Sequence, residues 1–200
     1  MSVSVAAVLF AAAITPGPNN LVVMSAAARD GLRGTIAPIA GIVLGTLALV
    51  LAVQLGLNAI LVKWPATAQV FRLFGAGLLF YIGVRIVLAG WADADLETGD
   101  TRRDLTNDTL SLFGALFALQ IVNPKTWVLA ATVGTTYVSQ GSGTLATLVA
   151  LTLAIPSACL AIWGLGGLAL APFLARTLPR RVFAVGAGGS LIGFAGLLLV

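Results

Sequence analysis

The chain has 200 residues, of which 59% are apolar and only 9% are charged, and its mean hydropathy is +1.05. These values lie outside the range of soluble globular domains and predict a membrane protein. The net charge of +4 does not indicate nucleic-acid binding, because the eleven basic residues are scattered at the ends of apolar segments and form no continuous face. The single cysteine, Cys159, excludes an intrachain disulfide.

Six apolar segments each have roughly the 20 residues that a helix needs to cross a bilayer. We therefore predict an all-α, polytopic membrane protein of six transmembrane helices. The predicted spans are Val3 to Ala28, Thr35 to Leu57, Gln69 to Gly90, Leu110 to Tyr137, Leu145 to Pro172 and Arg181 to Val200.

The distribution of cations predicts the orientation. Most arginines follow the first, third and fifth spans, whereas the opposite side carries only Lys63 and Arg72. Because basic loops stay in the cytoplasm, both termini are predicted to be periplasmic. Three spans in each half also make the halves enter the membrane from opposite sides, as in two inverted three-helix repeats. We thus expect one membrane domain over residues 1–200, with a first half 1–91, a cytoplasmic linker 92–108 and a second half 109–200.

The first span contains a motif that is unusual at bilayer depth. It includes prolines, a glycine and neutral polar residues in one run: Thr15, Pro16, Gly17, Pro18, Asn19 and Asn20. The prolines remove backbone donors and predict an interrupted helix, whose free polar groups need a protein interior or a water-lined cavity. Such half-helix ends can bind a small polar solute. The alternative is a structural kink with asparagines packed between helices.

The fourth span repeats this pattern and adds a charge. Asn123 and Pro124 directly precede Lys125, which lies about 22 Å from one end of the predicted helix and about 18 Å from the other at 1.5 Å per residue. A lysine at that depth costs roughly 2.5 to 3.5 kcal/mol and needs compensation from a cavity, a break or a ligand carboxylate. The alternative is a shifted or tilted helix that brings Lys125 to an interface.

No aspartate or glutamate falls inside a predicted span, because Asp30 lies in the first loop and the other six acids lie in the linker. The sequence therefore favours a zwitterionic or neutral substrate whose carboxylate meets Lys125 or a half-helix N-terminus. With no histidine, one cysteine and no membrane acid, no metal site or cofactor is expected. An intramembrane enzyme is disfavoured, since Lys125 has no nucleophile beside it.

These motifs resemble the LysE/RhtB-type amino-acid exporters, which are small bacterial inner-membrane proteins with six helices in two halves. The resemblance rests on residues 15–20, on residues 29–34 around Asp30, on Gly41 with Gly45, on residues 74–83 and on Asn123, Pro124 and Lys125. It implies export of amino acids or related small metabolites, coupled to the proton gradient, with the two proline motifs facing each other. Thr46 stands where many relatives have an acidic or other polar residue, so the coupling ion stays open.

The sequence leaves two functional hypotheses. The first is a secondary exporter in the bacterial inner membrane that holds its substrate near the midplane between the two proline-broken helices. The second is a non-transporting membrane scaffold or assembly subunit, suggested by faces of small residues such as Gly41 and Gly45. Helix packing is the simplest role for these glycines and for Asp30 and Thr46 nearby, with gating or homodimer formation as alternatives.

Overall fold

The computed structural model describes residues 5–56, 65–91, 101–140, 144–174 and 176–199. Every secondary-structure element in these ranges is a helix, which confirms the all-α prediction. The elements are α1 (Val5–Ile14), α2 (Pro18–Asp30), the short 3-10 helix η1 (Leu32–Thr35), α3 (Ile36–Gln54), α5 (Pro65–Trp91), α6 (Thr101–Val122), α7 (Pro124–Gln140), α8 (Leu145–Leu174) and α9 (Thr177–Leu199).

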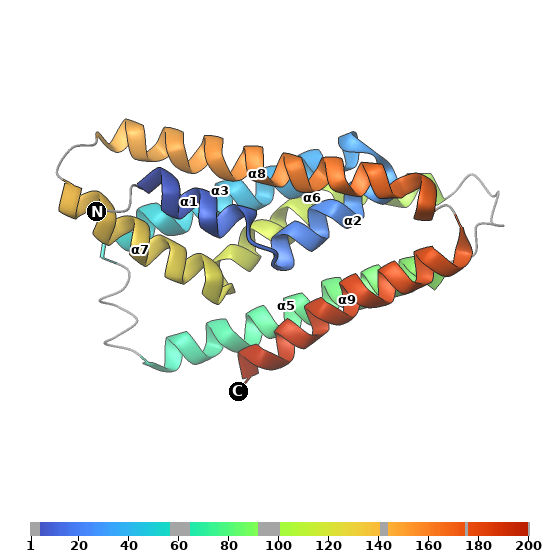
Figure 1. The fold of residues 1–200 in the computed structure, drawn as a ribbon. Coiled ribbons are helices and arrows are strands. Elements are labelled where there is room, and N and C mark those ends of the chain that lie inside the picture. The colour runs from blue at the N-terminus through green and yellow to red at the C-terminus, as the bar shows by residue number, and fades with distance from the viewer. Residues whose placement is uncertain (1–4, 57–64, 92–100, 141–143, 175, 200) are drawn as a thin grey trace.

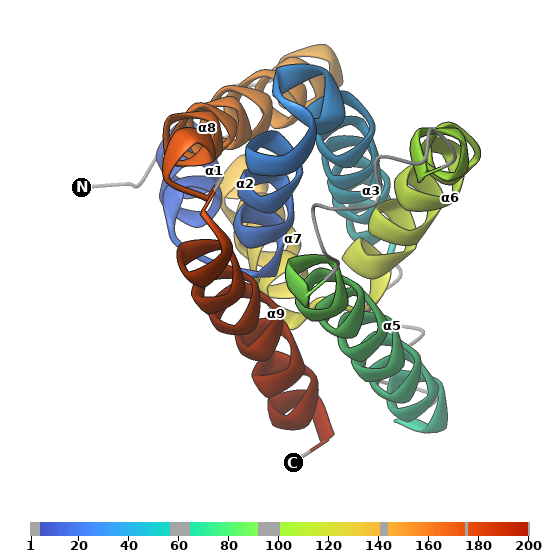
Figure 2. The ribbon, with the colours of Figure 1, turned by 90° about the vertical axis from the view of Figure 1, so that its right-hand side faces the viewer.

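The helices form an elongated bundle in which α1 with α2, then α3, α5, α6 with α7, α8 and α9 run in alternate directions along the long axis (Figure 1). As a result, α1 begins and α9 ends toward the same end of the bundle. The most extensive helix pairs are α5 with α9, α3 with α6, and α2 with α8. Figure 2 shows α5 and α9 as a pair beside a body built from the other helices. This pair meets the body through smaller contacts with α2, α6 and α8.

Several helices are apolar and long enough for a bilayer. Leu32–Gln54 and Leu145–Leu174 each meet this criterion alone. The segments Val5–Ile14 and Pro18–Asp30 meet it as a pair bent by 57°, and Leu110–Val122 with Pro124–Gly134 meet it as a pair bent by 64°. The described residues thus contain two candidate spans, or four if each bent pair is one span. The arrangement as six spans in two inverted repeats stays a prediction.

Prolines explain where the bent pairs divide. α1 ends at Ile14 and α2 begins with Pro18, while α6 ends at Val122 and α7 begins with Pro124. Proline fits the first position of a helix because its missing N–H would have no intrahelical partner there. Pro156 instead lies inside α8, where it removes the donor for the carbonyl of Thr152 four residues earlier.

Helix α6 begins earlier than the predicted fourth span, which starts at Leu110. This helix begins at Thr101, so residues 101–108 of the predicted linker are helical, and residues 92–100 lie outside the described residues. A polar stretch can be helical when it continues a helix whose apolar part packs in the bundle, and residues 101–108 continue α6 in this way.

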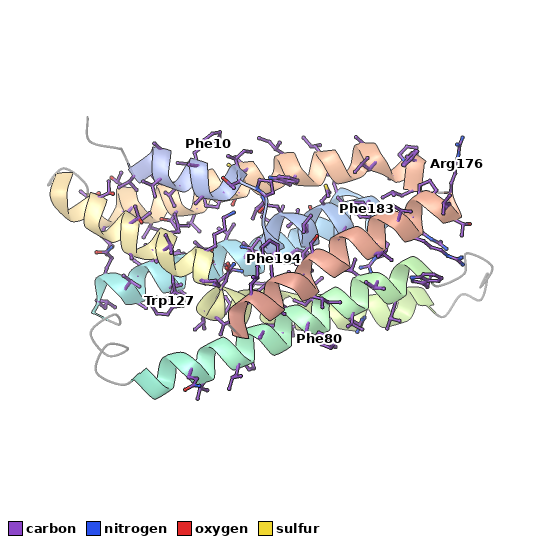
Figure 3. The ribbon with its side chains drawn as sticks, turned by 60° about the horizontal axis from the view of Figure 1, so that its bottom comes forward. Phe10, Phe80, Trp127, Arg176, Phe183 and Phe194 are labelled. Carbon is purple, nitrogen blue, oxygen red and sulfur yellow. The ribbon has the colours of Figure 1, made fainter. Side chains whose placement is uncertain are left out.

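The apolar interior is divided into two clusters. One joins α2, α3, α5, α6, α8 and α9 around residues such as Val23 and Leu116. The other joins α1, α3, α7 and α8 around Leu9 and Val133. Large apolar side chains such as Phe10 and Phe80 also point outward and are exposed, as suits a surface in contact with lipid (Figure 3). The two helix breaks lie between the clusters.

Candidate functional site

The break between α1 and α2 frees backbone carbonyls, and side chains from α2 and α8 bind two of them. The Nδ2 group of Asn20 donates to the carbonyl of Ala13 (2.9 Å), and the indole Nε1 of Trp163 on α8 donates to the carbonyl of Ile14 (3.2 Å). The hydroxyl of Thr15 donates to the carbonyl of Ala11. These bonds matter because an unsatisfied carbonyl at membrane depth costs several kcal/mol.

The second break is capped in a related way. The side-chain oxygen of Asn123 accepts a hydrogen bond from the backbone N–H of Lys125 (3.0 Å), so Asn123 caps the N-terminus of α7. The indole Nε1 of Trp127 donates to the carbonyl of Ile121, which belongs to the last turn of α6 (2.6 Å). Each break therefore pairs a side chain from the second half-helix with a carbonyl from the first.

Lys125 connects the two breaks directly. Its Nζ donates to the carbonyl oxygen of Thr15 (2.6 Å), although the residues are 110 positions apart. This carbonyl lies just after the C-terminus of α1, where the helix dipole favours a positive charge. The ammonium is thus stabilised by the broken backbone of the other half of the chain. Gly17 permits this approach, since a Cβ there would lie 3.1 Å from Nζ.

An amide network joins the same elements at their buried side. Asn19 on α2 and Gln120 on α6 exchange two hydrogen bonds, of 3.0 and 3.1 Å. The side-chain oxygen of Gln120 also accepts a bond from the hydroxyl of Thr126 (2.9 Å), and its Nε2 donates to the carbonyl of Leu116 (3.0 Å). Gln120 has no exposed surface and each atom of its amide has partners. The network fixes both breaks relative to each other.

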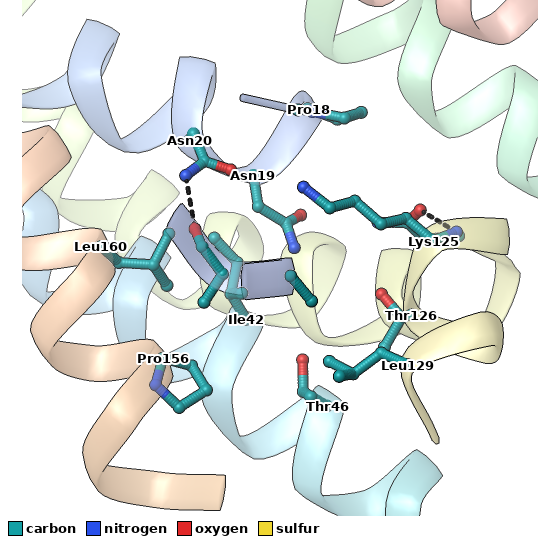
Figure 4. Close-up of a pocket in the computed structure, with 14 residues that line it drawn as sticks. Pro18, Asn19, Asn20, Ile42, Thr46, Lys125, Thr126, Leu129, Pro156 and Leu160 are labelled. Carbon is teal, nitrogen blue, oxygen red and sulfur yellow. Dashed lines mark hydrogen bonds between the residues drawn. The ribbon is translucent and has the colours of Figure 1, made fainter. Parts of the chain in front are cut away.

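A small cavity of about 40 Å³ lies between the two breaks (Figure 4). Its lining combines asparagine, threonine and lysine side chains with apolar ones, and no acidic residue is among the lining residues that the structure describes. The residues are Ala12, Ala13, Gly17, Pro18, Asn19, Asn20, Ile42, Thr46, Asn123, Lys125, Thr126, Leu129, Pro156 and Leu160. Because ligand pockets usually measure 300 Å³ or more, this cavity has room for water but is too small for an amino acid.

Hydrogen-bond donors dominate the polar groups around this cavity. The Nδ2 group of Asn123 is buried and has no hydrogen-bond partner among the described residues. At the N-terminus of α2, Gly17 provides no side-chain cap, and the first turn is closed by the bond from Leu21 N–H to the carbonyl of Gly17 (3.1 Å). The backbone N–H groups of Asn19 and Asn20 therefore lie before the first intrahelical hydrogen bond of α2 and have no acceptor within this helix. Together with the Lys125 ammonium, these donors suit an anionic group.

The predicted site residues divide into three groups. Those at the cavity are Gly17, Pro18, Asn19, Asn20, Asn123, Lys125 and Thr46. Those at the breaks but outside the cavity lining are Thr15, Pro16 and Pro124, which are exposed. Those elsewhere are Gly41, Gly45 and Asp30.

The last group contributes to packing in the structure. A Cβ on Gly41 would lie 2.5 Å from the carbonyl oxygen of Phe113, and one on Gly45 would lie 2.6 Å from that of Phe117, so both glycines let α3 approach α6 closely. Asp30 forms an ion pair with Arg29 (2.9 Å) at the end of α2, outside the cavity.

Sequence reasoning did not select four polar or aromatic residues that complete the site: Gln120, Thr126, Trp127 and Trp163. Gln120 carries the same signal as Asn123, an amide in the middle of an apolar segment. The tryptophans lacked a local signal, because aromatic residues are common in membrane helices. Trp163 in particular reaches a carbonyl 149 positions away, which only the tertiary structure shows.

Comparison with known proteins identifies the family. The model of the LysE type translocators matches residues 10–200. Among curated proteins, the chain is 31% identical over 127 residues to the cysteine/O-acetylserine efflux protein of Escherichia coli O1:K1, covering 63% of this chain and 60% of that protein. It is 27% identical over 116 residues to the leucine efflux protein of Salmonella choleraesuis, covering 56% of this chain and 51% of the relative.

A membrane protein of Pseudomonas aeruginosa is 28% identical over 112 residues, which are 56% of this chain and 52% of that protein. The chain thus matches between half and two thirds of the length of these relatives. No solved structure matches it. Since the family model covers nearly the whole sequence, this chain belongs to the LysE type translocator family.

Proposed function

We propose that this protein is a secondary transporter that exports amino acids or closely related metabolites across the bacterial inner membrane. The family match and the relatives named as efflux proteins support an amino-acid exporter. The observation that carries the mechanism is the bond from the Lys125 ammonium to the carbonyl of Thr15, which links two helix breaks beside a cavity rich in donors. In this proposal each bent pair, α1 with α2 and α6 with α7, is one broken transmembrane span.

The polar groups at the cavity favour an amino-acid zwitterion as substrate. Its carboxylate would bind the Lys125 ammonium, the Nδ2 group of Asn123 and the N-terminus of α2, which all supply donors. Its ammonium would then take the place of Lys125 at the carbonyl of Thr15. In the structure the lysine thus contacts the acceptor that the substrate amine would use.

Substrate loading requires the helices around the cavity to separate, because its volume of about 40 Å³ does not admit an amino acid. A lysine released from Thr15 would remove the direct bond between the two breaks. Substrate binding would therefore be coupled to opening. We propose that the proton gradient drives the cycle, although the cavity lining holds no carboxylate to carry a proton.

The orientation is also part of the proposal. The arginines whose side chains are described lie toward one end of the bundle, where Arg176 is seen in Figure 3. The positive-inside rule makes that end cytoplasmic and both termini periplasmic. The alternating helix directions support the six-span arrangement in two inverted halves, with α3 and α8 as second helices, and α5 and α9 as third helices, of their halves.

Counterflow of labelled amino acids in proteoliposomes tests the transport proposal. We expect leucine, cysteine or O-acetylserine to exchange in the wild type, and Lys125→Ala to reduce exchange to background. Lys125→Arg keeps the charge and should retain part of the exchange. Ser190→Ala is the matched control, because this exposed serine on α9 bonds only within its own helix. Wild-type exchange in Lys125→Ala would remove the lysine from the mechanism.

The scaffold hypothesis gives a different result in the same preparation. It predicts a stoichiometric partner that copurifies with the full chain, and no exchange of any amino acid. Neither the family nor the named efflux relatives favour this alternative.

A further inference from the structure

A second cavity, of about 400 Å³, shares no lining residue with the first and lies between the α5–α9 pair and the body of the bundle. Residues from α2, α5, α6, α8 and α9 line it. Most of them are apolar, and they include Val22, Ile82, Ile86, Leu112, Leu174 and Phe183. Its position follows from the packing, since α5 and α9 contact each other more extensively than they contact the body.

Three arginines contribute to this otherwise apolar lining: Arg29 from α2, Arg85 from α5 and Arg180 from α9. No aspartate or glutamate is among the lining residues that the structure describes. Arg29 pairs with Asp30 (2.9 Å), and Arg85 donates to the hydroxyl of Tyr81 (3.0 Å). A guanidinium has five N–H donors, so an arginine that already contacts one acceptor can also bind a phosphate oxygen. The lining residues that the structure describes are therefore basic at their charged positions and apolar between them.

The surroundings of this cavity resemble a membrane interface. At the end of α5, the guanidinium of Arg181 lies over the ring of Trp91, 4.7 Å from its centroid. The Arg85 guanidinium also lies 5.9 Å from the ring of Tyr81, which is itself part of the lining. Tryptophan and tyrosine with flanking arginines are typical of the headgroup level of a bilayer. Basic pockets between transmembrane helices at this level bind anionic lipid headgroups.

We propose that this cavity binds an anionic phospholipid. Its phosphate would lie among Arg29, Arg85 and Arg180, and an acyl chain would lie against the apolar side chains of α5, α6 and α9. Bidentate contacts between guanidinium and phosphate give the specificity for anionic lipid. The lipid would fill the gap between the α5–α9 pair and the body, and so stabilise their relative position. This site is independent of the transport proposal.

Native mass spectrometry of the full-length protein, with lipids added to the detergent-solubilised sample, tests the proposal. We expect phosphatidylglycerol to be retained in preference to phosphatidylcholine. Arg85→Gln and Arg180→Gln should each lower the affinity for phosphatidylglycerol about fivefold, the equivalent of about 1 kcal/mol per arginine. Arg33→Gln and Arg176→Gln are matched controls, because these exposed arginines occupy the same end of the bundle outside the cavity.

A second variant tests the cavity without changing charge. Ala115→Phe places a large side chain into the lining, and should displace phosphatidylglycerol while leaving the arginines in place. Ala115→Phe tests the lipid-binding proposal even if the arginine variants do not fold. Equal retention of both lipids, or equal loss in the Arg33 and Arg176 controls, would overturn the proposal. So would displacement of phosphatidylglycerol by free L-leucine, which would make the cavity a vestibule for substrate.

Discussion

The side-chain amides of Asn19 and Gln120 exchange two hydrogen bonds across 101 positions of sequence. Each residue is next to one of the two helix breaks, so the pair aligns the ends of α2 and α6. In lipid, the driving force for helix association comes from packing and from such interhelical bonds. The pair therefore contributes both to stability and to the geometry of the cavity.

We expect Gln120→Ala to lower the free energy of unfolding by about 1 to 3 kcal/mol, because it leaves the half-buried amide of Asn19 and the buried hydroxyl of Thr126 without their partner. Unfolding in mixed micelles measures the change. The double variant Asn19→Ala with Gln120→Ala should cost less than the sum of the two single variants. Strict additivity would show that the two amides do not interact.

Close packing of α3 on α6 gives a second prediction. Gly45→Ala should destabilise the protein by about 1 to 3 kcal/mol, because the new Cβ would lie 2.6 Å from the carbonyl of Phe117 and 2.8 Å from Cγ of Gln120. Gly77→Ala on α5 is the control, since no heavy atom lies within 4 Å of its Cβ position. Thermal unfolding of both variants in detergent compares them. Equal midpoints would contradict the tight approach.

Much of this arrangement could be predicted from residue types and spacing. The prolines at positions 16, 18 and 124 predicted where helices end, because proline has no N–H donor and excludes the preceding turn. Lys125 could be predicted as a site residue, because a charge in an apolar segment needs a compensating partner. Its partner could not be predicted, because the carbonyl of Thr15 has no side-chain signal and depends on how the two halves pack.

The same limit applies to the second cavity and to the start of α6. The arginines 29, 85 and 180 indicated topology, but only the separation of the α5–α9 pair from the body brings them to one cavity. Helix α6 begins at Thr101 within a polar stretch, where apolar periodicity gives no boundary. Residue types and spacing thus predict where helices break, whereas contacts between residues far apart in the sequence are seen only in the tertiary structure.

The two roles that we propose for Asn123 can be separated by substitution. Its side-chain oxygen accepts a hydrogen bond from the N–H of Lys125, whereas its Nδ2 group has no partner among the described residues and is proposed to bind the substrate carboxylate. Asn123→Asp keeps an oxygen for the cap but replaces the donor by a negative charge. We expect near wild-type thermal stability with at least a tenfold rise in KM for amino-acid exchange, equivalent to about 1.4 kcal/mol.

Asn123→Ala serves as the comparison for that variant. It loses the cap as well, so its stability should fall by about 1 kcal/mol in addition to its loss of exchange. If Asn123→Asp exchanges amino acids with an unchanged KM, the Nδ2 group does not contact substrate.

Thr46 allows a test of how charge at the cavity controls the substrate. This buried threonine and Lys125 both line the cavity, which contains no acid. We expect Thr46→Asp to supply an internal anion that competes with the substrate carboxylate for the lysine, so that exchange of leucine falls at least tenfold, about 1.4 kcal/mol. Thr46→Asn introduces a side chain that has the shape of aspartate but no charge, and this variant should retain most of the exchange. A diamine or an amino-acid amide, which has no carboxylate to be repelled, should lose less exchange in Thr46→Asp than leucine does. Equal losses for all substrates would mean that the aspartate distorts the cavity and does not compete for Lys125.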